Sequence, residues 1–166
     1  MNQLILGGAR SGKSRYAETL AQATGKQLIY LATGEPGDAE MQKRIAIHRE
    51  GRASQWQTVE EPIALAERLV TMNEAGNAVV VDCLTLWLSN CLTAGVLNQQ
   101  KDALMDLLPQ LVCDLYLVSN EVGSGVVPLG ELSREFVDQS GWLHQRLAEH
   151  CERVTLVVAG LPMTLK

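Results

Sequence analysis

The sequence predicts an α/β fold with a mostly parallel sheet and flanking helices, and two observations support this prediction. Several apolar segments rich in valine, isoleucine and leucine, such as AVVV at 78–81, lack the polar alternation of a strand with one exposed face. Segments of helical periodicity separate these strands, as they do in right-handed βαβ crossovers. No linker, internal repeat or low-complexity stretch interrupts the chain, so a single domain is expected over residues 1–166.

The expected elements follow one another along the whole chain. Continuous apolar runs predict strands at 3–6, 27–32, 78–81, 115–119 and 154–159, with a short final strand at 163–165. Apolar residues at helical spacing predict helices at 13–24, 38–49, 62–73, 84–92, 101–111 and 133–149. Local signals mark several helix ends: Gly25 closes the first helix, Asp38 caps the second, and Pro62 suits the first turn of the third.

The composition argues against several classes of function. The formal net charge of -5 disfavours a general binder of nucleic acid or of an anionic membrane. The four cysteines are scattered without a Cys-x-x-Cys pair, which disfavours a zinc site and a disulfide framework and predicts free thiols in a reducing cytoplasm. No signal peptide is visible, and the longest apolar runs are too short for a membrane span, so a cytoplasmic protein is expected.

The segment GGARSGKS follows the first expected strand and matches the phosphate-binding pattern G-x-x-x-x-G-K-[ST]. In this pattern the glycines let backbone N–H groups turn toward a phosphate, and the lysine places a charge near the β- and γ-phosphate oxygens. The serine hydroxyl can ligate Mg²⁺, and the helix that begins at the lysine points its positive end at the same anion. The nucleotide-binding residues predicted in this loop are Gly7, Gly8, Ala9, Arg10, Ser11, Gly12, Lys13 and Ser14.

The alternative for this loop is a tight turn that joins a strand to a helix and binds nothing. The pattern lies between an expected strand and an expected helix, which is the context a phosphate loop requires, and this favours phosphate binding. The Asn-Lys-x-Asp motif is absent from the sequence, which disfavours a Ras-like GTPase.

Asp82 ends the apolar strand in VVVDC and is a second candidate for the same site. In a parallel sheet the carboxyl ends of the strands lie where ligands bind, so this carboxylate is expected beside the phosphate loop. There it can hold Mg²⁺ directly or through water. The alternative is that Asp82 only caps the turn that follows the strand.

A third candidate is the basic helix EMQKRIAIHREGR at 40–52. Arg44, His48 and Arg52 fall on neighbouring turns of one face. Neighbouring cations disfavour the imidazolium and keep a nucleophilic nitrogen free, and they can also grip phosphate oxygens. This combination suits phosphoryl or nucleotidyl transfer to histidine, whereas the alternative is a solvated basic face in which His48 is incidental.

Three segments together give the chain a resemblance to a known family. They are GGARSGKSRYAE at 7–18, MQKRIAIHREGR at 41–52 and SNEVGSGVVPLGELSREFVDQSG at 119–141, the last followed by HQRLAE at 144–149. They resemble the bifunctional adenosylcobinamide kinase / adenosylcobinamide-phosphate guanylyltransferase of cobalamin biosynthesis. The resemblance implies a RecA-like P-loop fold, a homotrimer, and two reactions: phosphorylation of adenosylcobinamide with ATP or GTP, and transfer of GMP from GTP to adenosylcobinamide phosphate.

The resemblance also assigns roles to individual residues. It implies that His48 is the guanylylated nucleophile, that Lys13 serves catalysis in the phosphate loop, and that Ser14 and Asp82 hold Mg²⁺. The further nucleotide contacts that it implies are Thr33, Gly34, Glu35, Arg49, Glu50, Gly51, Arg52, Glu60 and Asp82.

The chain departs from the family pattern at three positions. Trp142 and His144 stand where arginine-like and asparagine-like residues are expected, and Ala53 stands where proline is usual. Glu121 follows the fourth expected strand, and it could serve as a base in the kinase reaction or cap the following turn. Two other functions stay open from the residues: a P-loop kinase of another small alcohol, with His48 structural, and a nucleotide-binding regulatory protein without turnover.

Overall fold

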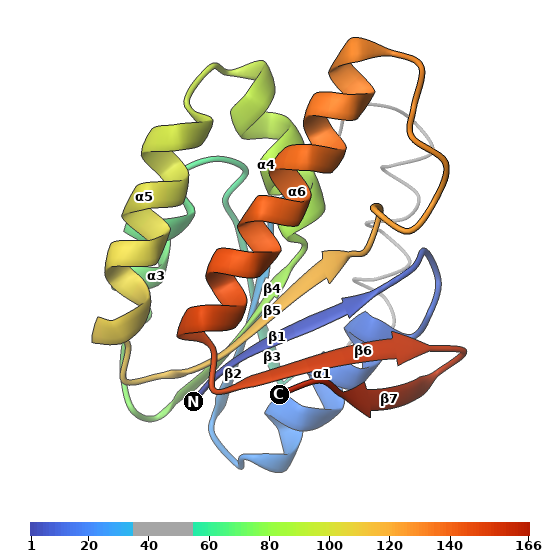
Figure 1. Cartoon of the computed structure of the whole chain (residues 1–166). Coiled ribbons are helices and arrows are strands. Elements are labelled where there is room, and N and C mark those ends of the chain that lie inside the picture. The colour runs from blue at the N-terminus through green and yellow to red at the C-terminus, as the bar shows by residue number, and fades with distance from the viewer. Residues whose placement is uncertain (35–54) are drawn as a thin grey trace.

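The computed structural model describes residues 1–34 and 55–166, which form one seven-stranded sheet with helices on both faces (Figure 1). The strand order is β3-β2-β4-β5-β1-β6-β7, and β7 alone among these strands is antiparallel to its neighbour. The strands are β1 (Asn2–Gly7), β2 (Gln27–Ala32), β3 (Trp56–Glu60), β4 (Asn77–Asp82), β5 (Asp114–Asn120), β6 (Arg153–Val158) and β7 (Leu161–Thr164).

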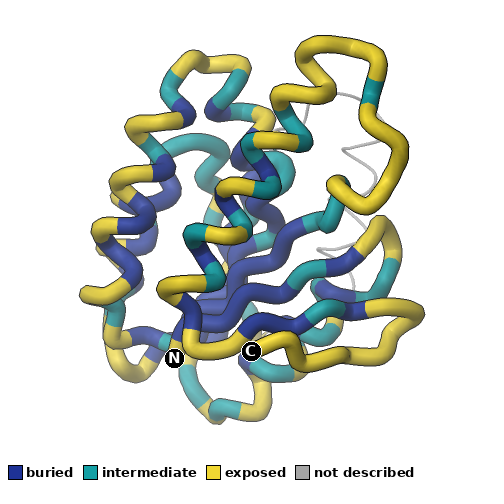
Figure 2. The backbone as a smooth tube through the Cα atoms, viewed as in Figure 1, coloured by how far each residue is buried: buried dark blue, intermediate teal, exposed yellow. Residues whose placement is uncertain are grey.

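Helices cover the two faces of the sheet unequally, and each face has its own apolar core. The described helices are α1 (Lys13–Ala23), α3 (Leu65–Val70), α4 (Leu84–Thr93), α5 (Leu97–Leu107), the 3₁₀ turn η1 (Leu108–Gln110) and α6 (Glu131–His150). The larger core joins one face to α3, α4, α5 and α6, and the smaller core lies between the other face and α1. The central strands are therefore buried along most of their length, as Figure 2 shows. None of the helices within residues 1–34 and 55–166 combines the length and apolar composition that crossing a membrane requires.

The parallel register brings the carboxyl ends of six strands to one edge of the sheet. Gly7 at the end of β1 lies opposite Asn120 of β5, and Ala32 of β2 lies between Asp82 of β4 and Glu60 of β3. The predicted fold class is confirmed, and the edge predicted to bind ligands carries the phosphate loop and Asp82 together.

Several element boundaries differ from the prediction, and one strand was missed. β3 was not predicted, because WQTVE is a short edge strand with mostly exposed side chains and no apolar run. The helix expected at 62–73 is α3, which is shorter because the Glu61 carboxylate accepts the N–H groups of Ile63 and Ala64 in a turn before it. The helix expected at 101–111 begins a turn earlier, at Leu97, and ends at Leu107. The helix expected at 38–49 lies outside the described residues.

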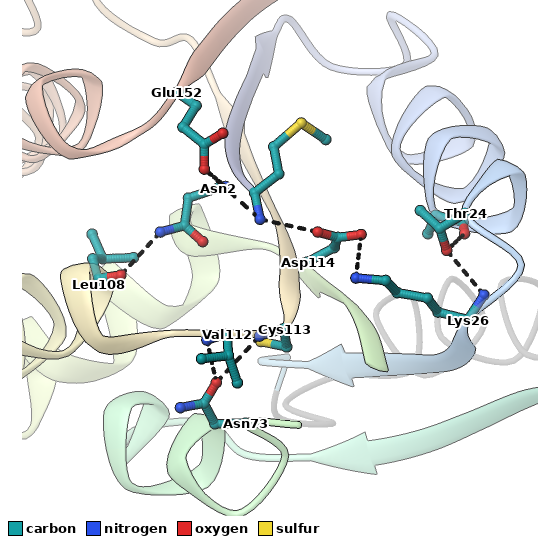
Figure 3. A network of polar contacts seen from close by, with 11 residues as sticks. Asn2, Thr24, Lys26, Asn73, Leu108, Val112, Cys113, Asp114 and Glu152 are labelled. Carbon is teal, nitrogen blue, oxygen red and sulfur yellow. Dashed lines mark hydrogen bonds and ion pairs between the residues drawn. The ribbon is translucent and has the colours of Figure 1, made fainter. Parts of the chain in front are cut away.

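A charged network ties the chain start to the amino ends of the strands, at the edge opposite the phosphate loop (Figure 3). The terminal ammonium of Met1 donates to Asp114 Oδ1 at 3.0 Å, and Lys26 Nζ lies 2.8 Å from Asp114 Oδ2. Burial alone would raise the pKa of the Asp114 carboxyl, but hydrogen bonds and charge from these two cations hold that pKa below its usual value. Asp114 is therefore stabilised as a carboxylate in the folded protein.

Replacing Asp114 with asparagine is expected to lower the free energy of unfolding by about 1–2 kcal/mol at pH 7. Because the folded pKa is depressed, this contribution is complete above the unfolded pKa of about 4 and is lost as the pH falls through the folded pKa. Urea unfolding of both proteins from pH 7 down to pH 3 measures the difference. Asp102→Asn removes a more exposed ion pair, with Arg146, and should change stability little at any pH; an equal loss in both variants would contradict the prediction.

Candidate functional site

The phosphate loop runs from the end of β1 into the first turn of α1, as the sequence pattern requires. Gly12 has a φ of 97°, and a Cβ there would lie 3.2 Å from the Cα of Gly160, so glycine suits both the backbone conformation and the space. A Cβ at Gly7 would lie 2.6 Å from the carbonyl oxygen of Val157 and would collide with it. The β6–β7 turn braces the loop further, because Gly160 N–H donates to the Ser11 carbonyl at 2.8 Å.

Lys13 begins α1 and is folded back over the loop. Its side chain is only 8% exposed, and Nζ donates to the carbonyl oxygen of Gly8 at 3.0 Å. This bond holds the ammonium within the curve of the loop, beside the helix N-terminus. A phosphate entering the loop would therefore meet a fixed positive charge, the N–H groups at the start of α1 and residue Ser14.

Asp82 lies at the same edge, two strands from β1 and so about 10 Å away by the usual spacing between strands. Its Oδ2 accepts a hydrogen bond of 2.6 Å from the hydroxyl of Tyr30, a buried residue of β2. This bond fixes the orientation of the carboxylate. Tyr30 was not among the predicted site residues; a tyrosine within the aliphatic run QLIYLA was the one available signal.

Thr33 has a supporting position rather than an exposed one. It is fully buried, its hydroxyl donates to the Cys83 carbonyl at 2.6 Å, and its Oγ1 accepts the Cys83 N–H at 2.9 Å. Asn90 of α4 donates to the Thr33 carbonyl at 2.9 Å and to the Pro62 carbonyl at 3.1 Å. The side chain of Thr33 therefore links the ends of β2 and β4, while the neighbouring Gly34 is partly exposed at the edge.

Glu121 adjoins the phosphate loop through its backbone, since its N–H donates to the Gly7 carbonyl at 3.0 Å. Its carboxylate accepts the Gly123 N–H at 2.7 Å. Hydrogen bonding from Ser124 is the largest influence that lowers the pKa of the Glu121 carboxyl, and protonation of His144 would lower it further. The carboxylate thus caps the turn that follows β5, as one of the two interpretations expected, and its role as a base stays a prediction.

The structure brings together only part of the predicted residue set. The loop residues 7–14, Thr33, Gly34 and Asp82 share the carboxyl edge of the sheet. Glu60 ends β3 at the same edge, but four strands from β1, which corresponds to about 19 Å. This distance suits a contact with the far end of a nucleotide better than a contact with its phosphates. His48, Glu35, Arg49, Glu50, Gly51 and Arg52 lie outside the described residues.

Comparison with known proteins gives one family across nearly the whole chain. The family described as "Cobinamide kinase / cobinamide phosphate guanyltransferase" matches residues 3–165. A bifunctional adenosylcobalamin biosynthesis protein, CobP of Pseudomonas aeruginosa, is 57% identical over all of this chain and 98% of its own length. Another bifunctional adenosylcobalamin biosynthesis protein, CobU of Escherichia coli, is 35% identical over 98% of each chain.

Solved structures resemble this chain at the level of the fold. The flagellar accessory protein FlaH of Methanocaldococcus jannaschii matches with a TM-score of 0.52 and 11% identity, over 99% of this chain and 77% of its own. The RadB recombinase matches with a TM-score of 0.50 and 16% identity, over 93% and 73%. The P4 protein of bacteriophage phi6 matches with a TM-score of 0.51 and 17% identity over 97% of this chain, which spans only 52% of that protein. These likenesses show the fold of RecA-like P-loop ATPases.

Proposed function

Because the chain belongs to the cobinamide kinase / cobinamide phosphate guanyltransferase family, we propose that one nucleotide site on its phosphate loop serves both reactions. The protein is a bifunctional enzyme of adenosylcobalamin biosynthesis, a cobinamide kinase and a cobinamide-phosphate guanylyltransferase. The observation that carries the proposal is the phosphate loop itself, in which Lys13 and the start of α1 face the same curve of backbone. Within residues 1–34 and 55–166, no second loop has this sequence pattern.

In the proposed kinase reaction the loop holds the triphosphate of ATP or GTP. The hydroxyl of adenosylcobinamide attacks the γ-phosphorus, the bond from that phosphorus to the β–γ bridging oxygen breaks, and the hydroxyl proton passes to a base or to water. Lys13 and the N–H groups of the loop stabilise the negative charge that shifts onto the departing diphosphate. Catalysis by this site is therefore mainly positioning and charge stabilisation.

In the proposed guanylyl transfer, GTP binds to the same loop and a nitrogen of His48 attacks its α-phosphorus. The bond to the α–β bridging oxygen breaks and pyrophosphate leaves, so that GMP is held as a phosphoramidate. A phosphate oxygen of adenosylcobinamide phosphate then attacks this phosphorus, which frees the imidazole and yields adenosylcobinamide-GDP. The further nucleotide contacts proposed for this reaction are Gly34, Glu35, Arg49, Glu50, Gly51, Arg52 and Glu60.

The oxygen donors at the edge suit Mg²⁺, which prefers hydroxyl, carboxylate and phosphate oxygens. Ser14 lies in the first turn of α1, and the Asp82 carboxylate is oriented by Tyr30. We propose Ser14 and Asp82 as the protein's Mg²⁺ ligands. Because β5 separates Asp82 from the strand that carries the phosphate loop, Asp82 would bind the ion through a water molecule. The ion would neutralise charge on the triphosphate.

Replacing Asp82 with asparagine is expected to lower kcat of the kinase reaction about 100-fold and to raise the Mg²⁺ concentration needed for half-maximal rate. Tyr30→Phe is the matched control, because it keeps the carboxylate and removes only the bond that orients it; its loss should be about fivefold. Steady-state assays over a Mg²⁺ series measure both. An Asp82→Asn variant with the original Mg²⁺ requirement would contradict the assignment.

We also propose that the enzyme assembles as a homotrimer, as its family resemblance implies. Exposed apolar side chains on and beside the β6–β7 hairpin support a subunit contact, because Val158, Leu161, Met163 and Leu165 are each more than half exposed. Sedimentation equilibrium of the purified protein measures the state, and a monomer at micromolar concentration would contradict it.

A further inference from the structure

Three side chains from separate elements contact one another near the carboxyl end of β5. Ser119 Oγ, at the end of this strand, lies 2.8 Å from Nε2 of His144 on α6. The same oxygen lies 3.5 Å from Oγ1 of Thr85 on α4, a long contact, and Thr85 Oγ1 accepts the Asn120 N–H at 2.8 Å. Ser119 is 1% exposed, so these contacts form within the protein and not in solvent.

The chemistry of the groups allows one continuous order of donors and acceptors. The Asn120 N–H can only donate, so Thr85 Oγ1 is its acceptor and the Thr85 hydroxyl proton can point toward Ser119. In this order the Ser119 hydroxyl proton points to His144, where Nε2 accepts it with a lone pair. A neutral imidazole with its proton on Nδ1 meets this requirement. A protonated imidazole has no lone pair to offer and would reverse the order of donors.

The surroundings of His144 favour the neutral ring. Burial is the larger influence and lowers the pKa of the imidazole below its ordinary value, while the nearby carboxylate of Glu121 acts in the opposite direction. Glu121 is the charged group that the ring faces from the β5–α6 loop, and its partners from β5 and α4, Ser119 and Thr85, carry no charge. The net effect lowers the pKa, so these surroundings favour the neutral ring near pH 7.

We propose that His144 is a positioning residue for the kinase reaction, which fixes the carboxyl end of β5 beside the phosphate loop by accepting the hydrogen bond of Ser119. The link to the loop is short, because Asn120 lies opposite Gly7 in the sheet and the next residue donates its N–H to the Gly7 carbonyl at 3.0 Å. The inference rests on the proposed nucleotide site. Protonation of His144 reorders Ser119 and Thr85 and loosens the strand end, so phosphoryl transfer slows as the pH falls.

Two substitutions at position 144 distinguish the role of His144 as a hydrogen-bond acceptor from the effect of its protonation. Glutamine offers a neutral acceptor that does not titrate, so His144→Gln should keep kcat within about threefold at pH 8. It should also lose the fall in kcat at acidic pH that we expect of the original enzyme. Leucine offers no acceptor, so His144→Leu should lower kcat about tenfold at pH 8 with KM for the nucleotide changed less than about twofold. The measurement is a kinase pH profile of kcat and KM from pH 5 to pH 9.

His150→Gln is the matched control, since His150 ends the same helix in an exposed position. This variant should keep the fall in kcat at acidic pH that is expected of the original enzyme. If kcat of His144→Gln still falls at acidic pH as it does in the original enzyme, the proposal is overturned, even if the leucine variant fails to fold. If the proposed nucleotide site is itself wrong, the result is different. Lys13→Met would then retain kinase activity, whatever pH profile the position 144 variants show.

Discussion

Replacing His48 with alanine is expected to abolish covalent attachment of GMP to the polypeptide while kinase kcat stays within about threefold of the original. The reason is that the imidazole is the proposed nucleophile only in guanylyl transfer, whereas the acceptor hydroxyl attacks directly in phosphorylation. Incubation with α-labelled GTP and Mg²⁺, followed by mass spectrometry of the intact chain, measures the adduct. A phosphoramidate should be labile in acid and stable in alkali.

The other two histidines provide the controls for this experiment. His150 is exposed at the end of α6, and His150→Ala should label as fully as the original protein. His144 is hydrogen-bonded to Ser119, so His144→Gln should also keep the label. Adduct that persists in the His48→Ala protein would reject the assignment. Loss of adduct together with loss of kinase activity would indicate that His48 supports the fold or the nucleotide site and is not a nucleophile.

The central part of the fold could be predicted from the sequence because its signals are local. The run QLIYLA coincides with β2, since a strand buried on both faces needs apolar residues at every position. β3 has no such signal: it is an edge strand, and its place is decided by backbone pairing with β2. The early start of α5 was missed for a related reason, because its first turn, at Leu97–Gln100, is mostly polar and solvent-facing.

The same distinction applies to the site. The phosphate loop is one contiguous segment with a fixed role for each residue, so its pattern alone was informative. The contact between Tyr30 and Asp82 joins residues 52 positions apart, and the contact between Ser119 and His144 joins residues 25 apart. Such pairs depend on strand register and on how a helix packs on the sheet, and a single sequence carries no local sign of either. From the sequence His144 was noted only as a departure from the family pattern, at a position where an asparagine-like residue is expected.

Lys13→Met is expected to lower both kinase kcat and the rate of adduct formation by about 100- to 1000-fold, because both reactions are proposed to use one phosphate site. Methionine keeps the unbranched stem of the side chain, so the space over the loop stays filled while the charge is lost. The bond from Nζ to the Gly8 carbonyl is lost as well, but the loop retains its brace from Gly160. The variant should therefore fold, and its thermal unfolding should show this.

The control for lost charge is Lys26→Met, which removes a cation at the opposite edge of the sheet. It should destabilise the protein, because Asp114 loses a partner, yet leave both reaction rates near the original in the folded enzyme. The decisive comparison is between the rates of the two reactions in the Lys13→Met variant. If phosphorylation collapses while GMP still attaches at the original rate, the two reactions do not share the loop, and GTP must bind for guanylyl transfer through other residues. A parallel fall in both rates is what a single anion site at the start of α1 requires, since the lysine charge acts on whichever phosphates lie in the loop.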